Sequence, residues 1–445
     1  MLMISVSGIR GIVGRDLYPE NTARYAAAFG TWAKRGRIIV GRDTRVSGPM
    51  LESVVVSALQ AVGCDVVKVG VVPTPTVAMA VLKHQAAGAV ILSASHNPAE
   101  WNALKFLNSK SEFLAPEEGH EVLDIAASGT MQYCAYDELG TVSVDDDALE
   151  YHINHILDLP YIDRDRIALR KFRVAVDAVN GAGSDSVPAL LAALGVEAVE
   201  TVHCAPNGLF PHNPEPLPEH LGDICDLVKR TGADIGFVTD PDADRLAVVD
   251  SDGVLFGEEN TQAAAFDFML NLKPGPVATN LSSSDVCEAV AAKYGQVVHR
   301  SPVGEIHVVR LMQKHDCVIG GEGNGGVINP DLHYGRDALV GIAMILQLLA
   351  DRGLSSAEYR QSLPEFFISK NKVQLTDTDP DRVLREVAQK YEANNPITSD
   401  GVKLRFDEGW VHLRKSNTEP IIRIYSEAST RDIADALARR IMQDL

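Results

Sequence analysis

Short apolar runs alternate with helix-like stretches through about the first 365 residues, and this alternation limits the possible folds more than any other feature of the chain. Each run ends in loop residues that lead into a helix-like stretch, which is typical of α/β domains. Ligands of such domains bind in the loops at the carboxyl ends of the strands. The clearest predicted strands are Arg37–Val40, Val66–Val69, Arg173–Val176, Ile235–Val238 and Asp316–Ile319.

The pattern changes after Leu363-Pro364, where the predicted elements form a compact α+β unit. They are a strand at 372–375, a helix at 381–393, strands at 402–406, 410–413 and 421–426, and a helix from 430. The length of 445 residues is enough for about three domains of ordinary size. Further connectors near 157–166 and 250–257 divide the chain into units at 1–157, 158–252, 253–365 and 366–445.

The charge of the chain restricts its partners. A formal net charge of −19 argues against general binding to nucleic acid, which requires Lys and Arg to neutralise phosphates. An anionic substrate must therefore meet a local basic pocket. No window approaches the ~18 uninterrupted apolar residues of a membrane span, and the N-terminus lacks the basic region of a signal peptide. We expect a cytoplasmic protein without a membrane partner.

A serine-bearing loop follows the apolar run Gly88–Leu92. In the segment 93–98, Ser-Ala-Ser-His-Asn-Pro, the proline lacks a backbone donor and biases Asn97 toward an extended conformation, so neither a helix nor a sheet ladder is expected to continue through Ser95. A serine presented in this way is a candidate nucleophile or phosphate carrier. The same residues also build an ordinary turn, and the segment alone leaves both interpretations open.

Three carboxylates at alternate positions directly follow the predicted strand at 235–238, and they are Asp240, Asp242 and Asp244. Oxygen ligands that converge in this way suit Mg²⁺, whereas without a cation the three charges repel one another. An EF-hand is excluded, because its sixth and twelfth positions would hold Arg245 and Ser251 instead of Gly and Glu. A capped, solvated turn is the alternative to a magnesium site.

Five glycines surround Glu322 and Asn324 in the segment 320–326, after the predicted strand that ends at Ile319. Missing side chains would let a ligand approach the backbone, while a carboxylate and an amide suit sugar hydroxyls. A flexible connector is the alternative interpretation.

The segment Arg414-Lys415-Ser416-Asn417-Thr418-Glu419-Pro420, with Arg423 just beyond it, is a candidate anion cradle. Arginine offers a fork to a phosphate, and the short polar side chains add donors. The segment is not a Walker A loop, and a solvated hairpin would have a similar composition. Near the N-terminus, Arg10 in Ser-Gly-Ile-Arg-Gly (7–11) adds a further cation at a strand end.

Other enzyme classes fit the sequence less well. The segment 176–183 is similar to a dinucleotide-binding fingerprint, but Ser186 stands where the third glycine is needed. The surroundings of Ser95 do not supply the G-x-S-x-G of a serine hydrolase. A metal-dependent phosphatase and a sugar-phosphate sensor without catalysis remain open.

Taken together and in this order, the four loops resemble those of the α-D-phosphohexomutase family, which includes phosphoglucomutase, phosphomannomutase and phosphoglucosamine mutase. The resemblance covers essentially the whole chain. It implies four domains around a central cleft, of which three are related α/β units with mixed sheets and the fourth is a C-terminal α+β domain. By the same resemblance, these domains would carry in turn the phosphoserine, the Mg²⁺ site, the sugar-recognition loop and the phosphate-binding loop.

The resemblance also implies roles for individual residues. Ser95 would be phosphorylated and would bind Mg²⁺ together with Asp240, Asp242 and Asp244. The other catalytic residues would be Arg10, Lys105, Arg245 and His96. The substrate would be bound by Glu322, Asn324, Arg414, Ser416, Asn417, Thr418 and Arg423.

The implied reaction interconverts hexose or hexosamine 1-phosphate and 6-phosphate. Phospho-Ser95 would donate its phosphoryl group to a sugar monophosphate, and the resulting hexose 1,6-bisphosphate would reorient and return its other phosphoryl group to the serine. The protein would align the groups and stabilise charge on the transferring oxygens. Lys105 is the candidate for proton transfer, because nearby positive charges would favour release of its proton.

Two departures from the family pattern concern the sugar. Asn324 and Gly326 stand where many relatives have Ser and His, and Glu305 follows Gly304 where several relatives have His or Asp. The segments 7–11 and 321–326 look most like the archaeal-type phosphoglucosamine mutase and phosphomannomutase branch. We therefore expect a phosphoglucosamine mutase, with a phosphomannomutase/phosphoglucomutase of dual specificity or a Mg²⁺-dependent sugar phosphatase as alternatives. The sequence leaves open a monomer or a homodimer.

Overall fold

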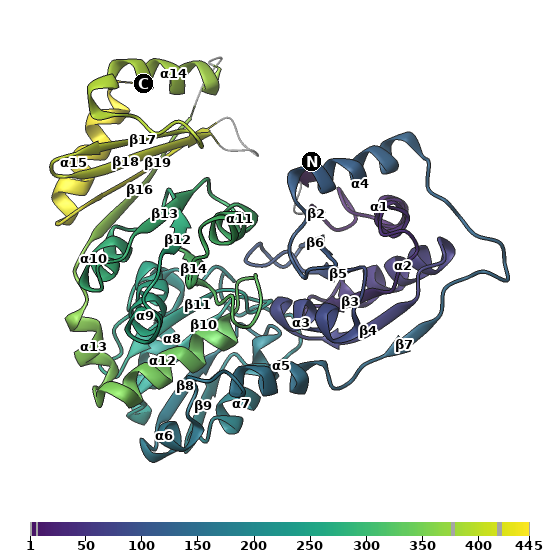
Figure 1. The fold of residues 1–445 in the computed structure, drawn as a ribbon, viewed down its shortest axis with the longest axis horizontal. Coiled ribbons are helices and arrows are strands. Elements are labelled where there is room, and N and C mark those ends of the chain that lie inside the picture. Colours follow the sequence, from purple (N-terminus) through teal and green to yellow (C-terminus); the bar gives the residue numbers. More distant parts are fainter. Residues whose placement is uncertain (1, 6–7, 375–378, 416–420, 445) are drawn as a thin grey trace.

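A computed structural model describes residues 2–5, 8–374, 379–415 and 421–444, which are organised by four β-sheets with their covering helices (Figure 1). The first sheet has the order β1-β2-β6-β5-β3-β4-β7. Its strands are β1 (Met3–Ser5), β2 (Gly8–Ile12), β3 (Ile38–Arg42), β4 (Val66–Val71), β5 (Gly88–Leu92), β6 (Trp101–Asn108) and β7 (Val142–Val144). Strands β3, β4, β5 and β7 pair with one another in parallel, whereas β1, β2 and β6 pair antiparallel with their neighbours.

Helices cover both faces of the central strands of this first sheet. Neighbouring residues of a strand point to opposite faces and therefore pack against different helices. Val40 packs in a cluster with α1 (Pro19–Trp32), α2 (Gly48–Ala61) and α4 (Pro116–Ser128), whereas the preceding Ile39 packs in another with α3 (Thr74–His84). The strands β3 and β5 are accordingly continuous apolar runs, which is the pattern of parallel strands covered on both sides. Between the first and second units lies α5 (Ala148–Leu157), whose Ile153 and Ile156 belong to the core of the second and third units.

The second and third sheets repeat the middle of the first. Their orders are β11-β10-β8-β9 and β13-β12-β14-β15, and in each a parallel trio carries one antiparallel edge strand. The second sheet consists of β8 (Arg173–Asp177), β9 (Ala198–Val202), β10 (Ile235–Thr239) and β11 (Leu246–Asp250). The third consists of β12 (Val277–Asn280), β13 (Val298–Ser301), β14 (Ile319–Glu322) and β15 (Gly326–Ile328).

The repeat places three loops at equivalent positions. The hairpins β5–β6, β10–β11 and β14–β15 each join a strand of the parallel set to its antiparallel neighbour. The Ser95 segment, the carboxylate segment and the glycine-rich segment are the connections of these three hairpins. The prediction of three related α/β units with mixed sheets is therefore confirmed, and the functional loops lie at the same end of each unit.

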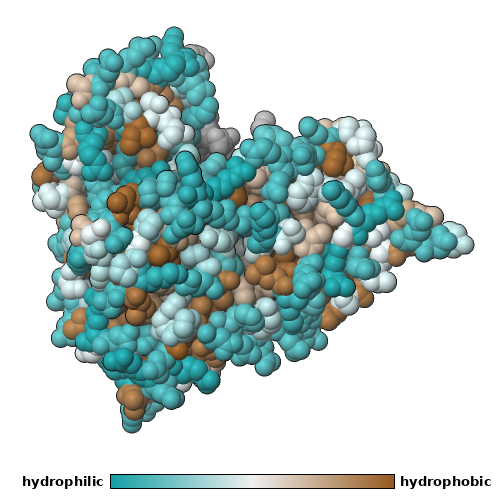
Figure 2. All heavy atoms as spheres, viewed as in Figure 1, coloured by the Kyte–Doolittle hydropathy of each residue, from teal (hydrophilic) through white to brown (hydrophobic). Residues whose placement is uncertain are grey.

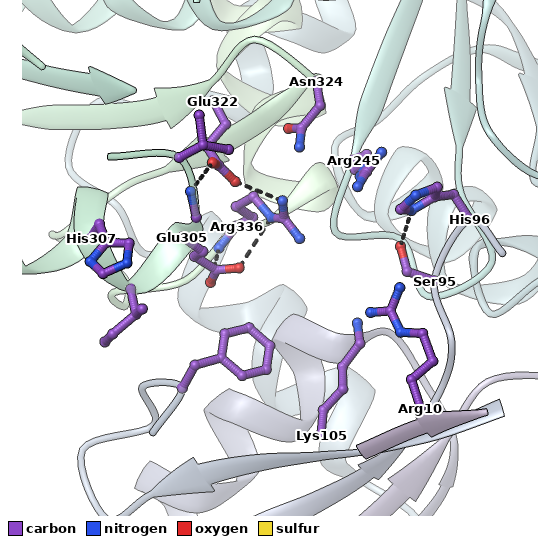
Figure 3. Close-up of a pocket in the computed structure, with 14 residues that line it drawn as sticks. Arg10, Ser95, His96, Lys105, Arg245, Glu305, His307, Glu322, Asn324 and Arg336 are labelled. Atoms are coloured by element: carbon purple, nitrogen blue, oxygen red, sulfur yellow. Dashed lines mark hydrogen bonds and ion pairs between the residues drawn. The ribbon is translucent and has the colours of Figure 1, made fainter. Parts of the chain in front are cut away.

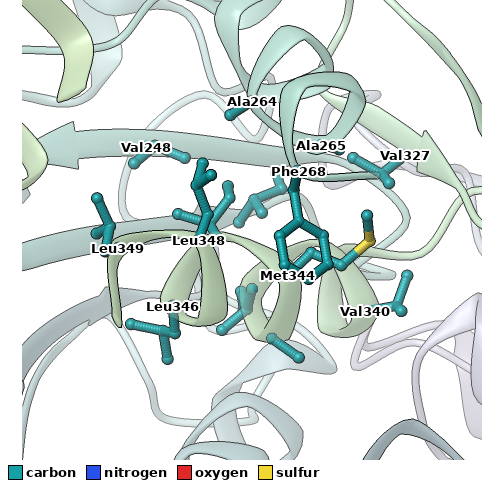
Figure 4. Close-up of a cluster of buried hydrophobic side chains, with 14 of the residues drawn as sticks. Val248, Ala264, Ala265, Phe268, Val327, Val340, Met344, Leu346, Leu348 and Leu349 are labelled. Carbon is teal, nitrogen blue, oxygen red and sulfur yellow. The ribbon is translucent and has the colours of Figure 1, made fainter. Parts of the chain in front are cut away.

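The second and third units share one hydrophobic core (Figure 4). All residues from 338 to 350 of α12 (Ala338–Arg352) are buried, so this helix is apolar on every side, as expected for a helix enclosed by other elements. It packs with α5, α9 (Glu258–Leu272) and the hairpin strand β15. The other helices of these units are α6 (Arg164–Leu169), α7 (Gly183–Ala193), α8 (Gly222–Thr231), α10 (Val286–Lys293), α11 (Glu305–His315) and α13 (Ser356–Ser362).

In the described part of the chain, no single helix is long and apolar enough to cross a membrane, although α12 and α13 pass that test as a pair bent by 91°.

The C-terminal unit is an antiparallel sheet of order β16-β19-β18-β17. Its elements are β16 (Phe367–Gln374), α14 (Pro380–Lys390), β17 (Val402–Phe406), β18 (Gly409–Lys415), β19 (Ile421–Ala428) and α15 (Arg431–Met442). Side chains of α14 and α15 join one core with the sheet, so both helices cover the same face. The predicted α+β domain is confirmed, with β16 beginning five residues earlier than the predicted strand at 372–375.

One predicted strand is displaced. The sequence predicts a strand at 316–319, but Asp316 ends α11 in the left-handed conformation with φ 51°, and β14 begins only at Ile319. The strand continues through Gly320, where Met312 of α11 packs against it. A Cβ at that glycine would lie 2.2 Å from Met312 Sδ, so the position has no room for a side chain. The expected glycine loop is thus a hairpin with Glu322 in its first strand.

The free face of the C-terminal sheet contacts the loop that precedes α10. Lys403 donates from Nζ to the carbonyl of Leu281 at 2.7 Å and lies 4.0 Å from the ring centre of Trp410. Two guanidinium nitrogens of Arg405 donate to the Asp285 carboxylate at 2.7 and 3.1 Å. These charged and polar contacts hold the fourth unit against the third.

Shortening a side chain in the shared core tests whether that core carries the stability of both units. Leu346→Ala is expected to lower the free energy of unfolding by about 2–5 kcal/mol, because it leaves a cavity in a close-packed interior. The matched control is Leu169→Ala, where the leucine is 81% exposed and the expected change is within about 0.5 kcal/mol. Thermal or denaturant unfolding measures both, and equal effects would contradict the packing described.

Lys403 gives the contact between the third and fourth units a predicted pH dependence. Burial, and then the charge of Arg300, lower the pKa of Lys403 to about 7. Between about pH 7 and 10 the unfolded chain therefore binds more protons here than the folded chain, so the stability rises with pH. The destabilising effect of the buried charge is complete below about pH 7.

Replacing this amine tests the assignment. Over pH 7 to 10 the melting temperature of the wild type is expected to rise relative to that of Lys403→Met, whose side chain does not titrate. The exposed lysine in Lys229→Met is the matched control and should leave the wild-type slope unchanged. Parallel profiles for the wild type and Lys403→Met would show that the buried lysine does not titrate in this range.

Candidate active site

The three hairpin loops meet at a cavity of about 410 Å³, to which Arg10 of β2 and Lys105 of β6 also contribute. Figure 3 shows the serine and its cations on one side and the third unit's hairpin on the other. Figure 2 shows a notch in the surface between the C-terminal unit and the first unit. The cavity is lined by Arg10, Ser95, His96, Lys105, Phe113, Arg245, Val303, Gly304, Glu305, Ile306, His307, Glu322, Asn324 and Arg336.

Ser95 is held in an unusual backbone conformation. Its φ is 49°, and its backbone N–H donates to Ser93 Oγ at 2.9 Å. The buried Arg45 fixes the loop, because its Nη2 donates to the carbonyls of Ser95 and Asn97 at 2.6 and 2.7 Å. Arg45 itself donates from Nε to Asp43 at 3.1 Å. A left-handed conformation at a non-glycine residue costs energy, and here the arginine stabilises it.

The Ser95 hydroxyl faces the carboxylates of the second unit. Ser95 Oγ donates to Asp240 Oδ2 at 2.5 Å and lies 3.3 Å from His96 Nδ1. Burial, and then the cations led by Arg245 and Arg10, lower the pKa of His96 to about 2, so its ring is neutral at physiological pH. The same positive surroundings favour an anionic group at the serine.

Asp240, Asp242 and Asp244 converge within the β10–β11 loop, with oxygens that all lie within 4.8 Å of one another. Burial and the charges of the other two carboxylates raise the pKa of Asp240. Burial would also raise the pKa of Asp242, but the Lys105 ammonium and the hydrogen bonds from Lys105 and Thr74 lower it.

This cluster fits a divalent cation. Asp242 Oδ1 and Asp244 Oδ1 are buried, and neither has a hydrogen-bond partner within residues 2–5, 8–374, 379–415 and 421–444. Leaving a buried carboxylate oxygen unpaired is costly, and a bound cation would satisfy both atoms. An all-oxygen set of this kind suits Mg²⁺.

Lys105 lies between the serine loop and the carboxylates. Its Nζ donates to Asp242 Oδ2 at 2.5 Å and is 3.9 Å from Asp244 Oδ2. The sequence-based reason for choosing Lys105 is a surrounding of positive charges, whereas its nearest charged partners in the structure are these two carboxylates. Thr74 Oγ1 donates to the same Asp242 oxygen at 2.6 Å, a contact that sequence reasoning did not predict.

Arg336 is the main residue of the cavity that sequence reasoning missed. Its Nη2 donates to Asp244 Oδ2 at 2.6 Å and its Nη1 to Glu322 Oε2 at 2.8 Å, so one guanidinium joins the carboxylate loop to the β14–β15 hairpin. Its Nε is 3.1 Å from Glu305 Oε2. The one available signal was its position directly before the long apolar run of α12.

The hairpin glycines make room for protein atoms and not, as expected, for a ligand. A Cβ at Gly323 would lie 2.0 Å from Glu259 Oε1, and one at Gly326 would lie 2.3 Å from Arg336 Cδ. At Gly325, whose φ is 85°, a Cβ would lie 2.3 Å from the carbonyl oxygen of Leu246. Glu322 at the end of β14 and Asn324 in the connection to β15 both line the cavity.

Glu305 is buried at the start of α11. Burial raises the pKa of Glu305 to about 7, although Arg336 opposes this effect. Its Oε1 accepts the backbone N–H of Arg336 at 3.0 Å. Glu322 accepts hydrogen bonds from Nδ2 of Asn280 at 2.9 Å and from the backbone N–H of Gly304 at 3.1 Å. Two carboxylates therefore lie in the wall of the cavity opposite the serine (Figure 3).

The C-terminal sheet brings a row of cations near the cavity. Arg423 of β19 lies directly opposite Arg414 on one neighbouring strand and Lys372 on the other, so the three side chains share a face of the sheet. Arg414 lines a pocket of about 350 Å³ that shares Val303 and His307 with the main cavity. The predicted ligands Ser416, Asn417 and Thr418 lie outside the described residues.

Comparison with known protein families gives four matches in chain order. They are the phosphoglucomutase/phosphomannomutase alpha/beta/alpha domain I at residues 2–132, domain II at 150–253, domain III at 258–367 and the C-terminal domain at 372–443.

Individual relatives match over nearly the whole length. The chain is 38% identical over 97% of its residues to the "probable phosphoglucosamine mutase" of Methanopyrus kandleri, covering 95% of that protein. It is 37% identical to the "phosphoglucomutase/phosphomannomutase" of Thermococcus kodakarensis, with 96% and 94% of the two chains covered. A crystal structure of a family protein from Burkholderia thailandensis superposes with a TM-score of 0.85 at 25% identity, over 99% and 96% of the chains. The chain therefore belongs to the phosphoglucomutase/phosphomannomutase family of phosphohexomutases.

Proposed function

We propose that the protein is a phosphoglucosamine mutase that interconverts glucosamine 1-phosphate and glucosamine 6-phosphate. The observation that carries the proposal is the position of Ser95 Oγ, 2.5 Å from the Asp240 carboxylate and in one cavity with Glu322 and Asn324. A transferable phosphoryl group on the serine would thus face both the carboxylate cluster and the sugar. The printed names of the relatives, which include phosphoglucosamine mutase, support the same activity.

In the proposed reaction, phosphorylated Ser95 transfers its phosphoryl group to the free hydroxyl of the sugar monophosphate. The serine P–O bond breaks as the sugar P–O bond forms, and a sugar bisphosphate results. After reorientation of the bisphosphate, its other phosphoryl group returns to the serine. Arg10 and Arg245 lie beside the serine and stabilise the charge on the transferring oxygens (Figure 3).

The remaining steps fall to groups on both sides of the serine. Lys105 lines the cavity and moves the proton between the serine and sugar oxygens. Asp240, Asp242 and Asp244 hold Mg²⁺ together with the serine, and the ion when bound supplies positive charge to the phosphoryl oxygens. Arg414 and Arg423 hold the phosphate that does not react, because like charges directly opposite on a sheet favour a bound anion.

The sugar preference rests on the carboxylates of the cavity. Glu305 and Glu322 line the wall opposite Ser95, and an amino sugar carries a cation that neutral hexoses lack. A carboxylate stabilises that cation by a charge-assisted hydrogen bond. A phosphomannomutase/phosphoglucomutase of dual specificity is the second candidate, since the relative from Thermococcus kodakarensis has that name. We further propose a cytoplasmic location. A single chain supplies all described residues that line the cavity.

Removing the serine hydroxyl tests the proposed reaction. Ser95→Ala is expected to lower mutase turnover by about 10⁴-fold or more, the order seen when a catalytic nucleophile is lost. Glucosamine, mannose and glucose 1-phosphates are assayed side by side with Mg²⁺ and a bisphosphate activator, and the control is the exposed Ser128→Ala. Full activity in Ser95→Ala would refute the mechanism, and release of phosphate without isomer formation would favour a phosphatase.

A neutral side chain at position 305 tests the sugar preference. Glu305→Gln is expected to lower kcat/KM for glucosamine phosphate about 10-fold to 100-fold more than for glucose phosphate, because it removes a hydrogen bond to a charged group. Glu408→Gln, at an exposed site between β17 and β18, is the matched control. An equal loss for both sugars would mean that Glu305 orders the cavity without reading the amino group.

A further inference from the structure

A second cluster of ligating side chains lies in the second unit, outside the cavity of Ser95. It is formed by Asp177 at the end of β8 together with His203 and His212. His203 Nδ1 is 2.9 Å and His212 Nε2 is 3.3 Å from the same oxygen, Asp177 Oδ2. Asp177 is buried, while the two histidine side chains are 16% and 14% exposed, so an ion from solvent can reach them.

Both histidines have an oxygen acceptor at each ring nitrogen. The outer nitrogen of His203, Nε2, is 3.3 Å from Asp223 Oδ2, and the outer nitrogen of His212, Nδ1, is 2.8 Å from the carbonyl of Asn213. A neutral imidazole has only one N–H, so it can satisfy only one of its two acceptors. With the outer nitrogens donating, the inner nitrogens direct two lone pairs toward the Asp177 carboxylate, and a cation between them could bind all three groups.

The surroundings orient the three groups toward one point. Asp177 Oδ1 accepts the backbone N–H of Val179 at 2.9 Å, which leaves Oδ2 for the histidines. The φ angles of Val179 and His203 are 45° and 51°, and a β-branched residue such as valine rarely adopts such a value. Strained backbone of this kind collects at functional sites, and outer partners that fix histidine rings are typical of metal sites.

We propose that Asp177, His203 and His212 bind a transition-metal ion of the Zn²⁺ class. Two imidazole nitrogens and one carboxylate oxygen are a donor set that zinc prefers, with a water molecule left to complete the coordination. The all-oxygen set of Asp240, Asp242 and Asp244 suits Mg²⁺ instead. The chain thus separates two kinds of divalent cation into two sites of different chemistry.

The proposed ion would tie down the segment 203–213, which contacts the first unit. The ring of Phe210 in this segment lies 4.9 Å from the guanidinium carbon of Arg45, the residue that holds the Ser95 loop. Gly208 packs so closely on Thr44 that a Cβ there would lie 2.1 Å from the carbonyl of Thr44. The ion would therefore act as a structural tether next to the serine loop, without contacting the substrate.

Zn²⁺ titration of the chelator-treated, full-length protein tests the proposal, with millimolar Mg²⁺ present to occupy the oxygen-only site. Four proteins are compared, namely the wild type, the double variant His203→Asn with His212→Gln, the control His220→Gln and the variant Asp242→Asn. Asparagine at 203 tolerates the left-handed backbone. Circular dichroism verifies that each protein is folded.

One equivalent of Zn²⁺ is expected to bind to the wild type, to His220→Gln and to Asp242→Asn, and at least 100-fold more weakly to the double variant. Pulsed EPR of the wild type with one equivalent of Cu²⁺ should detect two imidazole nitrogens, and the double variant should lose this signal. Binding that survives in the double variant, that disappears in Asp242→Asn, or that is missing in the wild type would overturn the proposal. So would a Cu²⁺ spectrum without imidazole nitrogen.

Discussion

The contact between Ser95 and the carboxylate loop is the interaction on which the rest of the site depends. Ser95 Oγ bonds to Asp240, while Thr74 and Lys105 bond to Asp242, so all three contacts cross from the first unit to the second. Carboxylates this deeply buried are tolerated only when hydrogen bonds, cations or a metal compensate them. The groups to which we assign the catalysis are therefore also the polar part of the contact between two domains.

The repeated architecture explains why these groups meet. In each of the first three units, the connection of one hairpin carries the functional side chains, and the units are arranged so that the three connections face one cavity. The shared core around α12 fixes the second unit against the third. The fourth unit contacts the third through Lys403 and Arg405, with charged groups in place of a common core.

Much of the fold and of the site could be predicted because both are local in sequence. Ser95 and Asp240 follow apolar strands directly, and a polar side chain at the end of a buried strand is a strong signal. Thr74 and Arg336 could not be predicted in this way, because they reach the site only through the approach of separate elements. The prediction that Gly323 makes room for a ligand was wrong for the same reason, since Glu259, which occupies that space, is distant in sequence.

Arg336 restricts which residues the β14–β15 hairpin can carry. A side chain at position 326 would overlap the Cδ of Arg336, so the hairpin cannot carry an imidazole there while the guanidinium bonds to Asp244 and Glu322. The positive charge in this part of the cavity comes from the start of α12 instead. Because the same guanidinium also lies against Glu305, one residue couples the carboxylate cluster to both acids that we propose to face the sugar. A change of cation at position 336 would thus alter metal binding and sugar recognition together.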